Sequence, residues 1–221
     1  MSKESSRRVD TTTNTYIDVG ADTQEGYAIS VKSRALAREV VGNATVEDRI
    51  RQRCSIAVGD FAMADLMRFC HDPVPAALTA LAAGSPIITD IRMVQTGIQK
   101  KGHACEVICA LDNGADIVKE QGITRSSAGF FALRDRIPGS IVVIGNAPSA
   151  LLSLCTMIRD GTRPAVVIGT PVGFVNAAES KELLRTVNIP SISNEGTRGG
   201  TPVAVAAANE CITIFIEGRK E

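Results

Sequence analysis

The stretch Ser140-Ile-Val-Val-Ile-Gly-Asn-Ala-Pro148 indicates the fold class most directly. It begins with a short, uninterrupted apolar run, which is typical of a strand buried on both faces of a parallel sheet. A turn with glycine and proline follows, and apolar residues then recur at helical spacing as far as Ile158. The stretch therefore predicts a buried strand, a tight turn and a helix.

Two later segments repeat this order. Ala165–Gly169 is an apolar strand followed by a Gly/Pro loop and a helix, whose start is marked by the capping-box spacing of Asn176 and Glu179. Ile189–Ser193 is a weaker strand, and its loop leads to Thr201-Pro202, which predicts a helix with Thr201 as N-cap. Strands that alternate with helices predict an α/β fold, a doubly wound, mostly parallel sheet with helices on both faces.

The first half of the chain is less regular. Residues 46–84 show helical spacing, with Pro73 and Pro75 separating two helices. Pro86–Ile91 and Cys105–Leu111 are predicted strands. Residues 1–24 are polar and rich in Ser and Thr, so we expect a flexible N-terminal arm followed by a single domain over residues 25–221.

Composition limits the classes of partner. Hydrophobic residues make up 44% of the 221 residues, and 24 basic residues balance 24 acidic ones. This balance gives no support to a nucleic-acid or membrane-surface role, which usually needs a basic excess. The chain has no apolar run long enough to span a bilayer and no apolar leader, so we expect a cytoplasmic protein. Six scattered cysteines and two histidines do not predict a metal site.

A ligand of such a fold is expected at the carboxyl ends of the strands. Three glycine-containing loops open helices there, at residues 145–149, 169–174 and 195–201. Backbone N–H groups at helix starts favour an anionic ligand. The alternative is that these glycines serve only the tight turns of the fold. The loops match neither the Walker loop nor the Gly-x-Gly-x-x-Gly dinucleotide fingerprint. An unrelated nucleotide-binding protein is therefore a weaker interpretation.

Basic residues lie near these loops: Arg125, Arg198 and Lys100-Lys101. Each alone is interpretable as a solvated surface charge. Several of them around one crevice would suit a substrate with several carboxylates.

Blocks of sequence along the chain resemble the precorrin-8X methylmutase family, in the family's order and spacing, from about Ser33 to Asn209. Each block alone is weak, but their combination is specific. The blocks are Ser85-Pro-Ile-Ile-Thr-Asp90 with Met93-Val94 and Gly97-Ile98, Glu106-Val-Ile-Cys109, Thr124-Arg-Ser126, Gly145-Asn-Ala-Pro-Ser-Ala-Leu151, Pro171-Val-Gly-Phe-Val175 with Ala177-Ala-Glu-Ser-Lys181, and Gly199-Gly-Thr-Pro-Val203 leading to Ala208-Asn209.

The resemblance implies an isomerase of cobalamin (corrin) biosynthesis. Such an enzyme moves a methyl group from C-11 to C-12 of precorrin-8X or cobalt-precorrin-8, a tetrapyrrole, and gives hydrogenobyrinate or cobyrinate. It implies a homodimer with active sites at the subunit interface and no separate cofactor. Whether the substrate carries cobalt stays open.

The resemblance also implies substrate contacts. Arg125 would clamp a carboxylate, with hydroxyls from Thr124 and Ser126, and Met93 and Phe174 would present apolar surface to the ring. Alternatives stay open: Met93 and Phe174 as core residues, Asn146 as a helix cap, Ser33 as a capping or solvent-facing hydroxyl. The full predicted substrate-binding set is Ser33, Met93, Gly97, Thr124, Arg125, Ser126, Asn146, Pro148, Phe174, Arg198, Gly199 and Gly200.

One position departs from the family. Its histidine, which the resemblance implies is a proton donor, sits in a segment like Arg-x-x-His-Ala-x-Gly, and Ile56 takes its place in Arg53–Asp60. Isoleucine cannot transfer a proton, so His71, Cys54, Ser55 or a bound water would have to act instead. Otherwise the chain catalyses slowly by shape alone, or it is a catalytically impaired corrinoid-binding or carrier protein. Arg34 also replaces a residue that is commonly aromatic.

Overall fold

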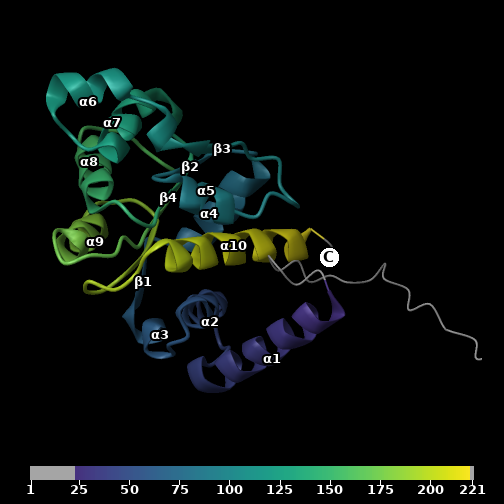
Figure 1. The fold of residues 1–221 in the computed structure, drawn as a ribbon. Coiled ribbons are helices and arrows are strands. Elements are labelled where there is room, and N and C mark those ends of the chain that lie inside the picture. Colours follow the sequence, from purple (N-terminus) through teal and green to yellow (C-terminus); the bar gives the residue numbers. More distant parts are fainter. Residues whose placement is uncertain (1–22, 220–221) are drawn as a thin grey trace, which may run out of the picture.

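The structure, a computed structural model, describes residues 23–219 (Figure 1). At its centre is a six-stranded sheet with the strand order β1-β6-β5-β4-β2-β3. All neighbouring strands are parallel except β1, which is antiparallel to β6. The doubly wound α/β prediction is confirmed. The strands are β1 (Met67–Cys70), β2 (Ile87–Thr89), β3 (Val107–Cys109), β4 (Ile141–Ile144), β5 (Val166–Gly169) and β6 (Ser191–Asn194).

Strands β4 and β5 are buried on both faces, as their apolar sequences predict. Val143 and Ile168 face one core, whereas Val142 and Val167 face the other. The first core is closed by α2 (Val46–Val58), α4 (Pro73–Ala82), α5 (Arg92–Gly97) and α10 (Thr201–Gly218). The second is closed by α7 (Arg125–Ala132), α8 (Pro148–Arg159) and α9 (Ala177–Thr186).

Shorter elements complete the fold. Helix α1 (Gln24–Val41) packs on α2, and α3 (Ala62–Leu66) joins α2 to β1. Helix α6 (Ala115–Gln121) packs on α7, and two 3₁₀ turns, η2 (Ala110–Asp112) and η3 (Arg134–Arg136), flank this pair in the chain. The predicted arm lies outside the described residues, apart from Thr23 and Gln24, which begin α1.

Three local predictions are wrong. Met67–Cys70 is an edge strand rather than helix, because four residues with one buried face are too few to show a period. Asn176 makes no capping bond and takes a left-handed φ of 61°. Thr201 is the first helical residue, and the cap is Gly200.

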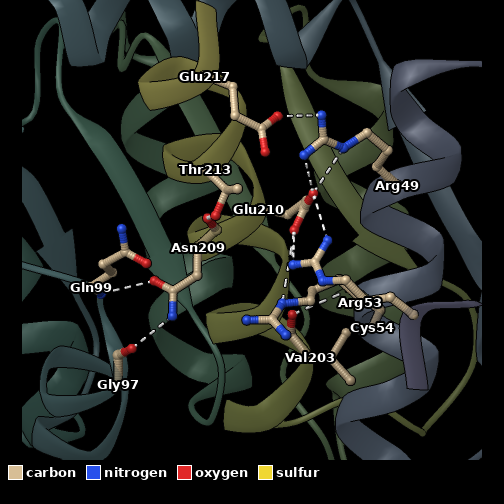
Figure 2. A network of polar contacts seen from close by, with 11 residues as sticks. Arg49, Arg53, Cys54, Gly97, Gln99, Val203, Asn209, Glu210, Thr213 and Glu217 are labelled. Carbon is tan, nitrogen blue, oxygen red and sulfur yellow. Dashed lines mark hydrogen bonds and ion pairs between the residues drawn. The ribbon is translucent and has the colours of Figure 1, made fainter. Parts of the chain in front are cut away.

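A cluster of charges ties α1 and α2 to α10 (Figure 2). Glu210 is fully buried and pairs with Arg34 at 2.9 Å and with Arg49 at 2.8 Å. Arg53 lies 3.8 Å from the same carboxylate, and Arg49 also pairs with Glu217 at 2.7 Å. The unusual Arg34 is thus explained by a buried acidic partner on α10.

Candidate active site

The parallel strands bring the three predicted loops together at one edge of the sheet, here called the carboxyl edge. The N–H of Gly200 donates to the carbonyl of Thr170 at 2.7 Å, which joins the loops after β6 and β5. A Cβ on Gly145 would lie 2.9 Å from the Cα of Thr201, so the loop after β4 touches the start of α10. The structure therefore confirms that these segments share one edge.

The first loop is held by a buried carboxylate. Asp90, at the end of β2, accepts hydrogen bonds from the N–H groups of Gly145 (3.2 Å), Asn146 (2.8 Å) and Ala147 (2.8 Å). Burial raises the pKa of Asp90, while the three N–H donors act in the opposite direction. The group of N–H donors predicted to hold a ligand anion is thus filled by the protein's own carboxylate.

The third loop owes its glycines to close packing. Gly199 and Gly200 have φ values of 143° and 104°, and a Cβ on Gly199 would lie 2.3 Å from the carbonyl oxygen of Thr170. For these residues, the structure supports the alternative that the turn itself requires glycine.

Lys181 holds the same loop through hydrogen bonds from its buried side chain. Its side chain is fully buried on α9, and Nζ donates to the carbonyl of Arg198 at 2.6 Å and to Oδ1 of Asn194 at 3.3 Å. Burial first, and the nearby Arg185 second, lower the pKa of Lys181 to about 8. The sequence alone does not reveal this role, because a lysine on a polar helix is usually a solvated surface charge.

The side chain of Arg198 joins this loop to the end of α2. Its Nη1 donates to Oδ2 of Asp60 at 2.5 Å, and both side chains are about half exposed. Beside the loop is a hollow of about 480 Å³, lined by Leu66, Glu182, Arg185, Glu195, Gly196, Thr197 and Arg198.

The starts of α7 and α8 meet through hydroxyl groups. Oγ1 of Thr124 lies 2.9 Å from Oγ of Ser149 and 2.9 Å from Oγ of Ser127. Thr124 and Arg125 are exposed, whereas Ser126 is buried. Arg125 therefore stands free at the edge, next to the loop after β4.

Apolar side chains are exposed around this edge. Phe174 is 94% exposed and Met93 67%, with Val172 and Val175 beside Phe174 on the loop after β5. The core alternative for Met93 and Phe174 is wrong. Asn146 is also exposed, and the cap of α8 is Ala147, so Asn146 is not a helix cap. Pro148 is the first residue of α8.

Two predicted contacts lie away from the edge loops. Gly97 packs against α10, because a Cβ there would lie 2.7 Å from Cγ2 of Val205, and its carbonyl accepts a bond from Asn209 at 2.9 Å (Figure 2). Ser33 lies on α1, one residue before Arg34.

The three side chains predicted as substitute proton donors are poorly placed. Cys54 is fully buried and its thiol lies 3.7 Å from the carbonyl of Val203, and burial raises its pKa far above the ordinary value. Ser55 is 1% exposed. His71 follows Cys70, which pairs with Ser191 at the start of β6, so it lies at the opposite edge of the sheet. None of them is both exposed and at the carboxyl edge.

Within residues 23–219, no three His, Cys, Asp or Glu side chains are grouped as a metal site, and no helix is long and apolar enough to cross a membrane.

The fold and these loops define a doubly wound α/β protein with a candidate binding site at the carboxyl edge of its sheet. A solved structure titled as precorrin-8X methylmutase from Thermus thermophilus superimposes with a TM-score of 0.81 at 34% identity, covering 87% of this chain and 97% of that one. A structure titled as a precorrin-8X methylmutase related protein gives a TM-score of 0.74 at 35% identity, covering 80% of this chain and 97% of that one.

Sequence relatives agree. Cobalt-precorrin-8 methylmutase of Methanocaldococcus jannaschii is 38% identical over 88% of this chain and 96% of its own length. Precorrin-8X methylmutase of Pseudomonas aeruginosa is 39% identical over 86% of this chain and 96% of its own. The sequence model of the precorrin-8X methylmutase family matches residues 28–214. This chain belongs to that family.

Proposed function

We propose that this chain is an isomerase that moves a methyl group from C-11 to C-12 of precorrin-8X or cobalt-precorrin-8. The product is hydrogenobyrinate or cobyrinate, in cobalamin biosynthesis. The family match over residues 28–214 carries this proposal. A cytoplasmic location is part of it, supported by six cysteines that are all free thiols, as in reducing compartments.

The substrate lies along the carboxyl edge in this proposal. The exposed side chains of Met93 and Phe174 contact the flat ring, which removes apolar surface from water. Arg125 and Arg198 pair with carboxylate arms of the substrate, and Thr124 adds a hydroxyl donor. Because Asp90 already occupies the N–H donors of the loop after β4, the arms bind side chains rather than that loop's backbone.

The proposed active unit is a homodimer with its sites at the subunit interface. Ser33 lies on α1, outside the layer of α2 and α10, whereas Arg125 lies beyond the sheet on α7 (Figure 1). Each layer of helix or sheet adds about 10 Å. One ligand that contacts both residues therefore needs Ser33 from one subunit and Arg125 from the other.

The chemistry is an intramolecular methyl shift that needs no separate cofactor. Protonation of the ring selects the tautomer in which the shift relieves crowding at C-11. A positioned acid contributes about 10²–10⁴-fold to such a reaction. The alternative, a corrinoid-binding or carrier protein with little catalysis, is suggested by Ile56, but the comparisons do not favour it over the enzyme.

The test is to mix the purified protein anaerobically with precorrin-8X, and separately with cobalt-precorrin-8, and to follow the visible spectrum. Repeated conversion to the product chromophore is the expected result, and the faster substrate settles the question of cobalt. A stoichiometric spectral shift without turnover would support the carrier instead.

A further inference from the structure

The end of α2 brings a carboxylate to the carboxyl edge. Gly59 ends the helix with a left-handed φ of 64°, and the N–H of Asp60 donates to the carbonyl of Ser55 at 3.1 Å. Asp60 therefore lies four residues after Ile56, just beyond the end of the helix. Its side chain is 41% exposed, unlike the sealed side chains of Cys54 and Ser55.

Both oxygens of Asp60 have defined partners. Oδ1 accepts from the N–H of Ala62 at 2.9 Å, which fixes the carboxylate at the start of α3. Oδ2 accepts from Arg198, a residue of the glycine loop at the edge. A carboxylate and a guanidinium thus meet at the junction of α2 and that loop, and both stay accessible to a ligand.

We propose that Asp60 exchanges the proton with the macrocycle in this chain, in place of the residue that Ile56 replaces. This inference rests on the proposed function. The O–H bond of the protonated Asp60 breaks and its proton bonds to the ring, which leaves a carboxylate. The methyl group then leaves C-11 as its bond to C-12 forms. The ring finally returns a proton to Asp60, so the reaction has no net gain or loss of protons or electrons.

Arg198 couples proton exchange at Asp60 to substrate binding in this proposal. In the free protein its guanidinium pairs with Oδ2 of Asp60. A substrate carboxylate that pairs with Arg198 takes this partner away and leaves Oδ2 of Asp60 open to the ring and to a proton delivered by water. Charged side chains on the adjoining elements include Asp65 on α3, the ion pair of Arg68 with Glu195 at 2.8 Å, and Arg53 on α2.

The experiment compares the unaltered chain with Asp60→Asn in the anaerobic turnover assay. We expect kcat to fall by about 100-fold or more, with KM and the affinity measured by tetrapyrrole titration unchanged. Adding Ile56→His to Asp60→Asn should restore kcat, because it returns a proton donor to the position used in the family. Asp72→Asn, at the opposite edge, is the matched control and should leave turnover unchanged.

Three results would overturn the assignment. One is a kcat in Asp60→Asn equal to that of the unaltered chain. Another is a loss of affinity in proportion to the loss of turnover, which would show that Asp60 only positions Arg198. The last is a loss of kcat that Ile56→His does not restore although Ile56→His alone is active. If the unaltered chain binds the tetrapyrrole without turning it over, the proposed function fails as well, so the two failures are distinguishable.

Discussion

Buried charges have different kinds of partner at the carboxyl edge and at the helical block formed by α1 and α2. At the edge, Asp90 and Lys181 are fully buried, and they bond to backbone and amide groups. At the helical block, three guanidinium groups of α1 and α2 surround the buried carboxylate of Glu210 on α10. The sequence blocks that resemble the family are predicted at the edge, whereas the two predicted departures, Ile56 and Arg34, lie in the helical block. This difference fits the two proposals made above, in which the ligand binds at the edge and Asp60, just beyond the end of α2, exchanges the proton.

The largest expected effect on folding is at Glu210. Glu210→Ala leaves Arg34, Arg49 and Arg53 close together without their carboxylate, which should cost about 3–5 kcal/mol of unfolding free energy. Urea unfolding measures it. The double variant with Arg34→Leu should recover part of the loss, because one like charge is removed. A loss below about 1 kcal/mol would show that the cluster does not hold α1.

Asp90→Ala should cost somewhat less, about 3 kcal/mol, because three backbone N–H groups lose their acceptor. Asp90→Asn retains one acceptor oxygen and should lose less. Urea unfolding of the pair checks this order. Equal stability of the two variants would contradict the role of the carboxylate in holding the loop.

Lys181 predicts a dependence on pH. Its pKa in the folded protein is about 8, below the ordinary 10.5, so between these values the unfolded chain binds a proton that the folded chain does not. Unfolding free energy should therefore rise by about 2 kcal/mol from pH 7.5 to 9.5, relative to Lys181→Met. The difference should be lost again as pH falls. If unfolding free energy changed with pH in the same way in both proteins, the lowered pKa of Lys181 would be contradicted.

The smallest effect on folding is expected at Phe174. Because this side chain is 94% exposed, Phe174→Ala should change stability by less than about 0.5 kcal/mol. Its affinity for the tetrapyrrole should fall about tenfold, since the ring loses an aromatic contact. Val46→Ala, an exposed apolar residue at the start of α2, is the control and should bind normally. Unchanged binding by Phe174→Ala would place the ring elsewhere.

The sheet and its loops could be predicted because strands buried on both faces leave an unbroken apolar signature, as in Ile141–Ile144. An unbroken apolar run does not mark β1, because this four-residue strand at the sheet edge contains the charged Arg68. The sequence could not show the role of Asp90, because only the folded chain brings the N–H groups of Gly145 to Ala147 onto its carboxylate.

Partners distant in sequence explain the rest. Arg34 and Glu210 are 176 positions apart, and Asp60 and Arg198 are 138 apart, so neither pair has a local spacing to detect. Helix periodicity also could not show that Ser55 is buried while the side chain of Asp60 is about half exposed. The chain leaves the helix at Gly59, between the two residues.

The most direct test of the account mixes two inactive variants, Ser33→Glu and Arg125→Glu, which place repelling charges in the helical block and at the edge. If the two regions meet across a dimer, each mixed dimer contains one intact site. An equal mixture should then recover about one quarter of the turnover of the unaltered protein. Turnover no greater than that of either variant alone, with subunit exchange confirmed by differently tagged copies, would contradict a site shared between the edge and the α1–α2 block.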